Sequence, residues 1–165
     1  MNRVDIDWRT VLRGGPPADR PGLHWHGFLW IGNGNDLYSY KRQPERTAGT
    51  AEFPASVLPP ESTAHYLLKA RLLKGTWTTA EAAADWMRAQ WDASTPTVTH
   101  VDPDNRRQYS AVTLSHGEDD VWRWWHPAPP GPGMVHVAVV CCPHKSPAGR
   151  ALPCPGPPPV GSSNM

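Results

Sequence analysis

The chain has 165 residues, enough for one domain of ordinary size with a buried core and no disulfide crosslinks. Its 16 basic and 15 acidic side chains nearly cancel, so no overall charge directs it toward nucleic acid or an anionic membrane. It contains no run of about 20 apolar residues, and the charged start at 1–7 lacks the apolar stretch of a signal peptide. We therefore expect a soluble, cytoplasmic protein without a membrane partner. The frequent use of Arg, Ala, Pro and Gly is typical of a high-GC bacterial genome.

The first half of the chain is predicted to contain a strand, a hairpin and a helix. A short strand is expected at 4–8. Alternating residues, the turn-forming sequence at 32–35 and a second extended run predict a β-hairpin over 23–42. An opening Pro-Pro-Glu, apolar residues at helical spacing and a stop at Gly75 predict a helix over 59–75.

The second half is predicted to begin with another helix and to continue as strands. The sequence Thr-Thr-Ala-Glu at 78–81 matches a capping box, which predicts a helix from about 79 to 92. Extended runs at 97–101 and 109–115, on either side of a turn-rich segment, predict a second hairpin. Two more strands are expected, at 121–125 and 134–140.

Strands, two central helices and then strands again predict an α+β fold. We expect an antiparallel sheet of about five to six strands, with the two helices packed on one face. This single domain is expected to occupy 1–145. Residues 146–165 are rich in Pro, Gly and Ser and have few apolar side chains to repay the entropy of ordering, so an extended or disordered tail is predicted.

Nine tryptophans are the main large apolar residues of the chain. An indole buries a large apolar area and needs one hydrogen-bond acceptor. In the strand expected to hold three of them, Trp122 and Trp124 would share one face, and Arg123 and Trp125 the other. We favour a strand covered on both faces. The alternative is a recognition surface formed by Trp122, Arg123, Trp125 and Trp30.

His24 and His26 are the first candidate site. Two residues apart on a strand, their side chains would project from the same face and reach one metal ion. The pattern resembles the His-x-His element of cupin metal sites, although Trp30 stands where that family has a carboxylate. The alternative is a strand whose polar face carries two imidazoles near solvent.

A second candidate site combines cysteine and histidine near the end of the chain. Zinc binds these residue types in tetrahedral sets. Three ligands would come from Cys142, His144 and Cys154, and a fourth from His116 or His126. The usual Cys-x-x-Cys spacing is absent, and the alternative is that the adjacent cysteines are small apolar residues ending a buried strand.

His116 belongs to a third pattern. His116-Gly117-Glu118, followed by a cysteine pair, is similar to the His-x-Glu and cysteine ligands of the zinc nucleobase deaminases. That family places Cys-x-x-Cys after a proline, whereas here Cys142 precedes the proline. The alternative is a plain turn built on Gly117.

Because none of these motifs is complete, we expect a non-enzymatic protein-interaction or regulatory domain, with another protein as its partner. The first alternative is a small hydrolase or nuclease-like enzyme that uses His24, His26 and His116 for acid–base or metal chemistry. The second is a zinc-stabilised binding module; apart from such a zinc ion, no cofactor is expected. Nucleic acid is a less favoured partner, since helix ends and hairpin tips account for the local basic clusters.

Overall fold

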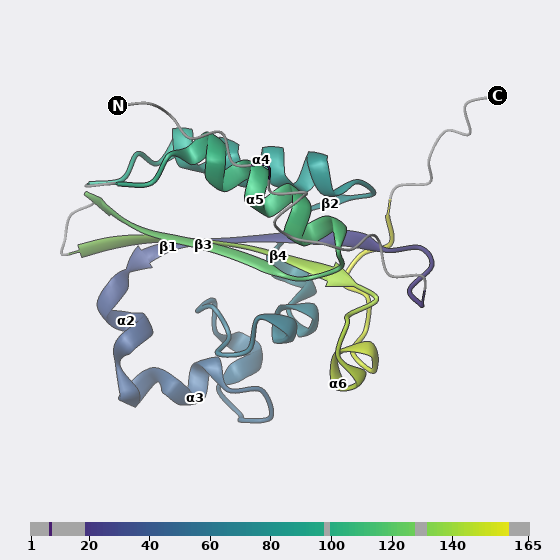
Figure 1. Ribbon diagram of the computed structural model, residues 1–165. Helices are drawn as coiled ribbons and strands as arrows, with labels where there is room; N and C mark the ends of the chain where they lie inside the picture. The colour runs from purple at the N-terminus through teal and green to yellow at the C-terminus, as the bar shows by residue number, and fades with distance from the viewer. Residues whose placement is uncertain (1–6, 8–18, 98–99, 128–131, 159–165) are drawn as a thin grey trace.

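The computed structural model describes residues 7, 19–97, 100–127 and 132–158 of the chain (Figure 1). Within this part the fold is α+β, as predicted, and it contains one antiparallel sheet. The sheet has four strands in these residues, where five to six were expected. Apart from Asp7, the strand expected at 4–8 lies outside the described residues.

The sheet is built around two long central strands. In spatial order its strands are β2 (Leu73–Trp77), β1 (His24–Asn33), β4 (Pro132–Cys142) and β3 (Asp120–Pro127). β1 and β4 pair along their length, with His24 opposite Cys142 at one end. The strands predicted at 121–125 and 134–140 are confirmed as β3 and β4, which pair with each other. The other neighbour of β4 is β1, which comes from a distant part of the sequence.

Alternation of side chains along the central strands divides the core into two layers. On one face, Trp25 and Val139 pack against helices α4 and α5. On the other face, Phe28 and Val140 pack against short helical turns, and Phe28 stacks on Tyr66 with 4.5 Å between the ring centroids. Both faces of the sheet are covered (Figure 1).

Two α-helices cover the first face, but only one of them was predicted. α4 (Ala80–Ala93) confirms the helix predicted from about 79, with its N-cap at Thr79, one residue after the Thr78 that opens the Thr-x-x-Glu motif. The Thr79 hydroxyl accepts a hydrogen bond from the backbone N–H of Ala82 at 3.2 Å. α5 (Pro103–Ser115) stands where the turn and the second strand of the expected hairpin were predicted, and residues 98–99 of that hairpin's first strand lie outside the described residues. Asp102 and Pro103, read as turn residues, are instead the N-cap and first residue of this helix, and the Asp102 carboxylate accepts from Asp104 N at 2.9 Å.

Short helical elements cover the second face, where a β-hairpin and an α-helix were predicted. In chain order they are α2 (Gly34–Tyr38), η1 (Tyr40–Arg42), α3 (Gln43–Arg46), η2 (Phe53–Ala55), η3 (Thr63–Leu68) and η4 (Ala70–Leu72). The hairpin over 23–42 is wrong after its first strand, because the Asn33 side chain caps α2 by accepting from Asn35 N at 2.9 Å. The helix over 59–75 is also wrong. It is interrupted at Lys69, whose buried ammonium donates to the Phe53 carbonyl at 2.9 Å, and β2 follows.

The segment after β4 turns back onto the domain. It contains the short helix α6 (Pro147–Arg150), capped by the Ser146 hydroxyl, and Arg150 pairs with Asp19 at 2.7 Å. The described part of the predicted tail therefore includes ordered structure, while 159–165 lie outside the described residues. None of the helices in the described part is long and apolar enough to cross a membrane.

Candidate metal centre

Four side chains of metal-ligand type meet at one end of the β1–β4 pair. They are His24, His26, Cys142 and Cys154, here called the His2Cys2 cluster. Their ligand atoms all lie within 4.8 Å of one another. Nε2 of His24 is 3.4 Å from the Cys154 sulfur, and Nε2 of His26 is 3.5 Å from it. A tetrahedral zinc ion at ordinary bond lengths holds nitrogen and sulfur ligands about 3.6 Å apart, so these separations fit one ion.

Strand pairing explains why three of these ligands meet. His24 and His26 point to the same face of β1, and Cys142 lies directly opposite His24 on β4. Cys141, one residue earlier, points to the opposite face and belongs to the core beneath the helices. Cys154 arrives from the segment that follows α6, and it is the one exposed member of the cluster.

Hydrogen bonds on the far side of each imidazole fix the orientation of the two rings. Nδ1 of His24 lies 2.8 Å from the Gly22 carbonyl oxygen, and Nδ1 of His26 lies 2.8 Å from the Thr76 hydroxyl. A carbonyl only accepts, so Nδ1 of His24 carries a proton, and Nε2 is the ring nitrogen left to face the Cys154 sulfur. Metal-binding histidines are held in this way by groups behind them.

Burial shifts the pKa of one imidazole and of one thiol in this cluster. Burial, and then the neighbouring His24, lowers the pKa of His26 to about 4, so its imidazole is neutral at pH 7 and able to bind a metal. Burial, and then the neighbouring Cys154, raises the pKa of Cys142 to about 12. A bound cation reverses this effect on a thiol, because it stabilises the thiolate directly.

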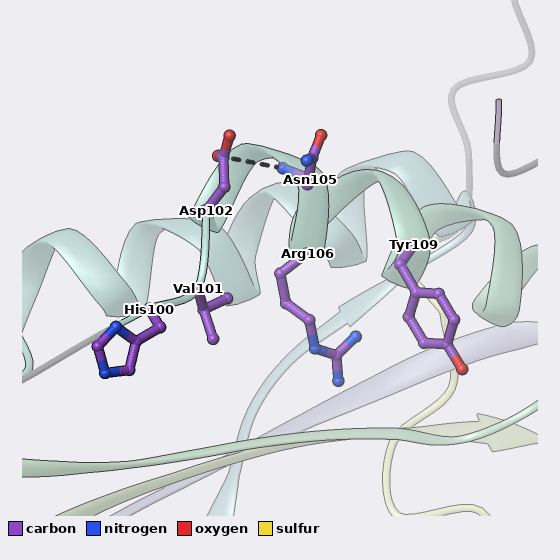
Figure 2. A pocket seen from close by; sticks show the side chains of 6 residues that line it. All are labelled: His100, Val101, Asp102, Asn105, Arg106 and Tyr109. Carbon is purple, nitrogen blue, oxygen red and sulfur yellow. Dashed lines mark hydrogen bonds between the residues drawn. The ribbon is translucent and has the colours of Figure 1, made fainter. Parts of the chain in front are cut away.

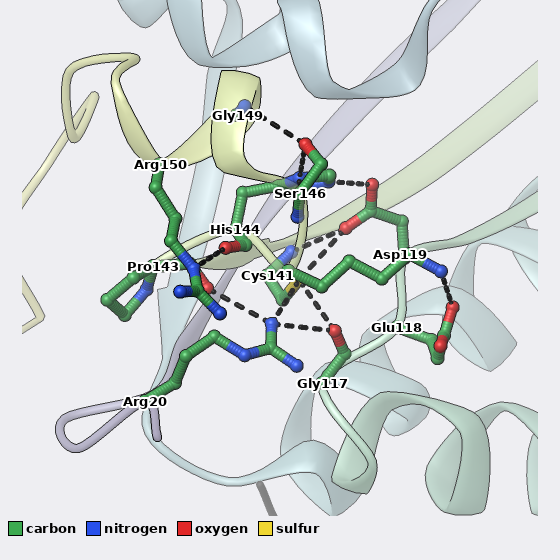
Figure 3. Close-up of polar contacts among 11 residues, drawn as sticks. Arg20, Gly117, Glu118, Asp119, Cys141, Pro143, His144, Ser146, Gly149 and Arg150 are labelled. Carbon is green, nitrogen blue, oxygen red and sulfur yellow. Dashed lines mark hydrogen bonds and ion pairs between the residues drawn. The ribbon is translucent and has the colours of Figure 1, made fainter.

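A second cluster of ligand-type residues lies nearby and is of a different kind (Figure 3). Asp119 Oδ2 is 2.7 Å from His144 Nε2, and Asp119 Oδ1 is 3.2 Å from the Cys141 sulfur. Arg20 is buried beside them, with Nη1 3.5 Å from that sulfur and 2.9 Å from the Gly117 carbonyl. We call this group the Asp119 network. A guanidinium so close to the thiol disfavours a metal cation there.

The Asp119 network also contains Ser146, His144 and Asp119 in hydrogen-bonded order. The Ser146 hydroxyl is 2.9 Å from Nδ1 of His144, but it also accepts from Gly149 N and so caps α6. Burial, and then the nearby Asp119 carboxylate, raises the pKa of Cys141 to about 12, which keeps it a thiol rather than a nucleophilic thiolate. These contacts hold the start of the C-terminal segment against the sheet.

The structure redistributes the metal ligands that the sequence suggested. Cys142 and Cys154 do meet, but their partners are the two histidines of β1, which had been assigned to a separate site. His144 belongs to the Asp119 network instead. The proposed fourth ligands lie elsewhere: His116 ends α5, and the His126 ring bonds to the Thr95 carbonyl at 3.0 Å.

The three histidines suggested for catalysis are not brought together. His24 and His26 share the face of the sheet that carries the short helical turns. His116 is the C-cap of α5 on the opposite face. An acid–base site that needs all three imidazoles is therefore not formed.

The suggested recognition surface is also divided. Trp122 and Trp30 are 3% and 8% exposed and lie in different core clusters, so neither is available to a partner. Trp125 is 44% exposed, with its ring 6.5 Å from that of the exposed Tyr38, and Arg123 is exposed as well. β3 was predicted to be covered on both faces. Its Trp122 and Trp124 side chains are buried beneath α4 and α5, whereas Arg123 and Trp125 on the other face are exposed.

A hollow of about 440 Å³ lies beside the start of α5 (Figure 2). Its lining residues are His100, Val101, Asp102, Asn105, Arg106 and Tyr109. Arg106 and Tyr109 point toward the sheet, whereas Asp102 and Asn105 point away from it. The Arg106 guanidinium is paired with Asp120 of β3 at 2.8 Å, so the strongest charge in this hollow is already neutralised.

Sequence reasoning missed three residues that shape these sites. Thr76, which orients His26, comes from β2, a strand that overlaps the end of the helix predicted over 59–75. Asp119 and Arg20 carry no motif. Their roles depend on β4 and the loop after α5 lying side by side, which no local pattern reveals.

Comparisons with protein-family models, with curated proteins and with solved structures give no match to this chain. Its function must therefore be inferred from the residues themselves.

Proposed function

We propose that this chain is a zinc-stabilised binding module, in which the His2Cys2 cluster holds one structural zinc ion. The observation that carries the proposal is the convergence of two imidazole nitrogens and two sulfurs within 4.8 Å of one another. Thiolate and imidazole ligands together are typical of zinc, and a set of two each is a common structural combination.

A structural role is favoured over a catalytic one by the number of protein ligands. Catalytic zinc keeps a coordination position open for water or substrate, whereas four protein ligands close the coordination shell. The ion would tie Cys154 to two strands of the sheet and fix the segment that follows β4. Two thiolates would also neutralise its charge in a largely buried place.

The role that follows is non-enzymatic, with another protein as the partner. Trp125 and Tyr38 support this part of the proposal, because exposed aromatic side chains of this kind are enriched at protein interfaces. A hydrolase or nuclease-like activity has less support, since His116 lies apart from the other two histidines.

The metal content of the purified protein tests the zinc proposal. Protein prepared without chelators should contain one zinc ion per chain by elemental analysis. Cys142→Ser should lose this zinc, because a hydroxyl is a poor zinc ligand. Cys141→Ser is the matched control: it makes the same chemical change one residue away, on the opposite face of β4, and should keep the ion.

Two results would contradict the proposal. One is a wild-type protein that takes up no zinc even when the metal is supplied. The other is loss of zinc in Cys141→Ser but not in Cys142→Ser, which would move the metal to the Asp119 network.

A further inference from the structure

A polar hollow of about 290 Å³ lies on the sheet face that carries the short helical turns. Its walls come from α3, the start of η3 and the strands β3 and β4. The polar residues that line it are Arg46, Glu61, Thr63, Arg123 and His136. It is separate from the His2Cys2 cluster and shares no residue with it.

The two arginines of the hollow bring two positive charges. Arg46 is positioned by neutral groups: Nε donates to the Pro59 carbonyl and Nη1 to the Leu37 carbonyl, each at 2.7 Å. Arg123 lies directly opposite His136 in the β3–β4 pair. Among the residues that the structure describes, no carboxylate forms an ion pair with either guanidinium.

The one carboxylate in the hollow is engaged by other residues. Glu61 Oε1 accepts from Gln43 Nε2 at 2.9 Å, and Oε2 accepts from the Thr47 hydroxyl at 3.4 Å. These bonds join Glu61 to α3 and its C-cap rather than to the guanidiniums. Two guanidiniums against one carboxylate leave the hollow with a net positive charge.

His136 lies at the inner wall of the hollow. It is 7% exposed, and its Nδ1 lies 3.4 Å from the Tyr66 hydroxyl. Burial, and then the charges of Arg123 and Arg46, lowers its pKa to about 4, so the ring is neutral at pH 7. The positive charges of both arginines are therefore close enough to His136 to lower its pKa.

We propose that this hollow, the Arg46–Arg123 pocket, binds the phosphoryl group of a small-molecule ligand. Guanidiniums match phosphate oxygens with two-pronged hydrogen bonds, and here they stand on different walls beside a threonine hydroxyl and an imidazole. Donors on several sides suit a tetrahedral oxyanion. A planar carboxylate would accept hydrogen bonds from one guanidinium and leave the second arginine without an acceptor. The volume is at the small end for ligand sites and suits a phosphoryl group with a small organic part.

Titration with inorganic phosphate, followed by calorimetry at constant ionic strength, tests this pocket. The wild-type protein should bind one phosphate per chain in a saturable way. Arg123→Gln should weaken binding at least about tenfold, because it removes a charge-assisted contact. Thr63→Ala should weaken it by a smaller factor. Lys74→Gln is the control: it removes the same charge from an exposed position on β2, the opposite edge strand, and should change the affinity by less than about twofold.

Three results would overturn the pocket. They are the absence of saturable binding, equal weakening by Lys74→Gln and Arg123→Gln, and binding of acetate as tight as that of phosphate. Circular dichroism of each variant checks that the sheet is intact. None of these substitutions changes a zinc ligand. Absence of phosphate binding would therefore leave the zinc proposal intact, and absence of zinc would leave the phosphate proposal intact.

Discussion

Removing zinc from the purified protein is expected to lower its midpoint of thermal unfolding by about 10 °C. A ligand that binds only the folded state, at a free concentration about 1,000 times its Kd, stabilises that state by about 4 kcal/mol. For a chain of this size, each kcal/mol corresponds to a shift of about 2–4 °C. Differential scanning calorimetry of the zinc-loaded and chelator-treated protein measures the shift directly.

Cys154→Ser separates the effect of the metal from any general weakening of the fold. Cys154 is exposed, so its substitution should leave the metal-free protein nearly as stable as before. In this variant, added zinc should raise the unfolding midpoint far less than in the wild type. If zinc leaves the wild-type midpoint unchanged, or stabilises the variant equally, the ion does not bridge the C-terminal segment and the sheet.

Trp122→Ala is expected to destabilise the fold by about 3–5 kcal/mol, the usual cost of truncating a fully buried large aromatic. Trp122 is 3% exposed, its indole N–H donates to the Ser110 hydroxyl at 2.9 Å, and its ring meets that of Trp91 edge-on at 6.2 Å. The substitution removes these contacts together and leaves a cavity beneath α5. Urea unfolding followed by circular dichroism measures the loss.

Trp125→Ala, on the same strand, is the matched control for Trp122→Ala. Its indole is 44% exposed, lies on the other face of β3 and packs against Gly34, so we expect a smaller loss, of about 1–2 kcal/mol. If both variants lost the same free energy of unfolding, the assignment of Trp122 to the core face of β3 and Trp125 to its exposed face would be wrong. A larger loss for Trp125→Ala would show that the face of Trp125 is the one that stabilises the fold.

Local signals predicted those parts of the fold that local interactions determine. The Thr-Thr-Ala-Glu sequence at 78–81 predicted the start of α4 to within a residue, since Thr79 is the observed N-cap. Short runs rich in aromatic and apolar residues predicted β3 and β4. Local signals failed where the same residue type is favoured in two different local structures. Asn33 suits a hairpin turn as well as the N-cap that it forms, and Asp102 followed by a proline suits a turn as well as the helix start it provides.

The candidate site shows the same limit more sharply. Parity along a strand correctly predicted that His24 and His26 share a face. The cysteine and histidine pattern grouped Cys142 and Cys154, which do lie together, with His144, which lies in the Asp119 network. The sequence could not show that these pairs form one cluster. The cluster forms because His24 lies opposite Cys142 in the β1–β4 pair. These two strands are far apart in the sequence, and the pairing of distant strands has no local signature.

X-ray absorption spectroscopy of the zinc-loaded protein tests the central claim most directly, because it reports the atoms bound to the metal. We predict two sulfur ligands at about 2.3 Å and two nitrogen ligands at about 2.0–2.1 Å. Substitution of His26 by Ala should remove one nitrogen and leave both sulfurs. A shell dominated by oxygen, or one containing a single sulfur, would contradict a closed site built from His24, His26, Cys142 and Cys154.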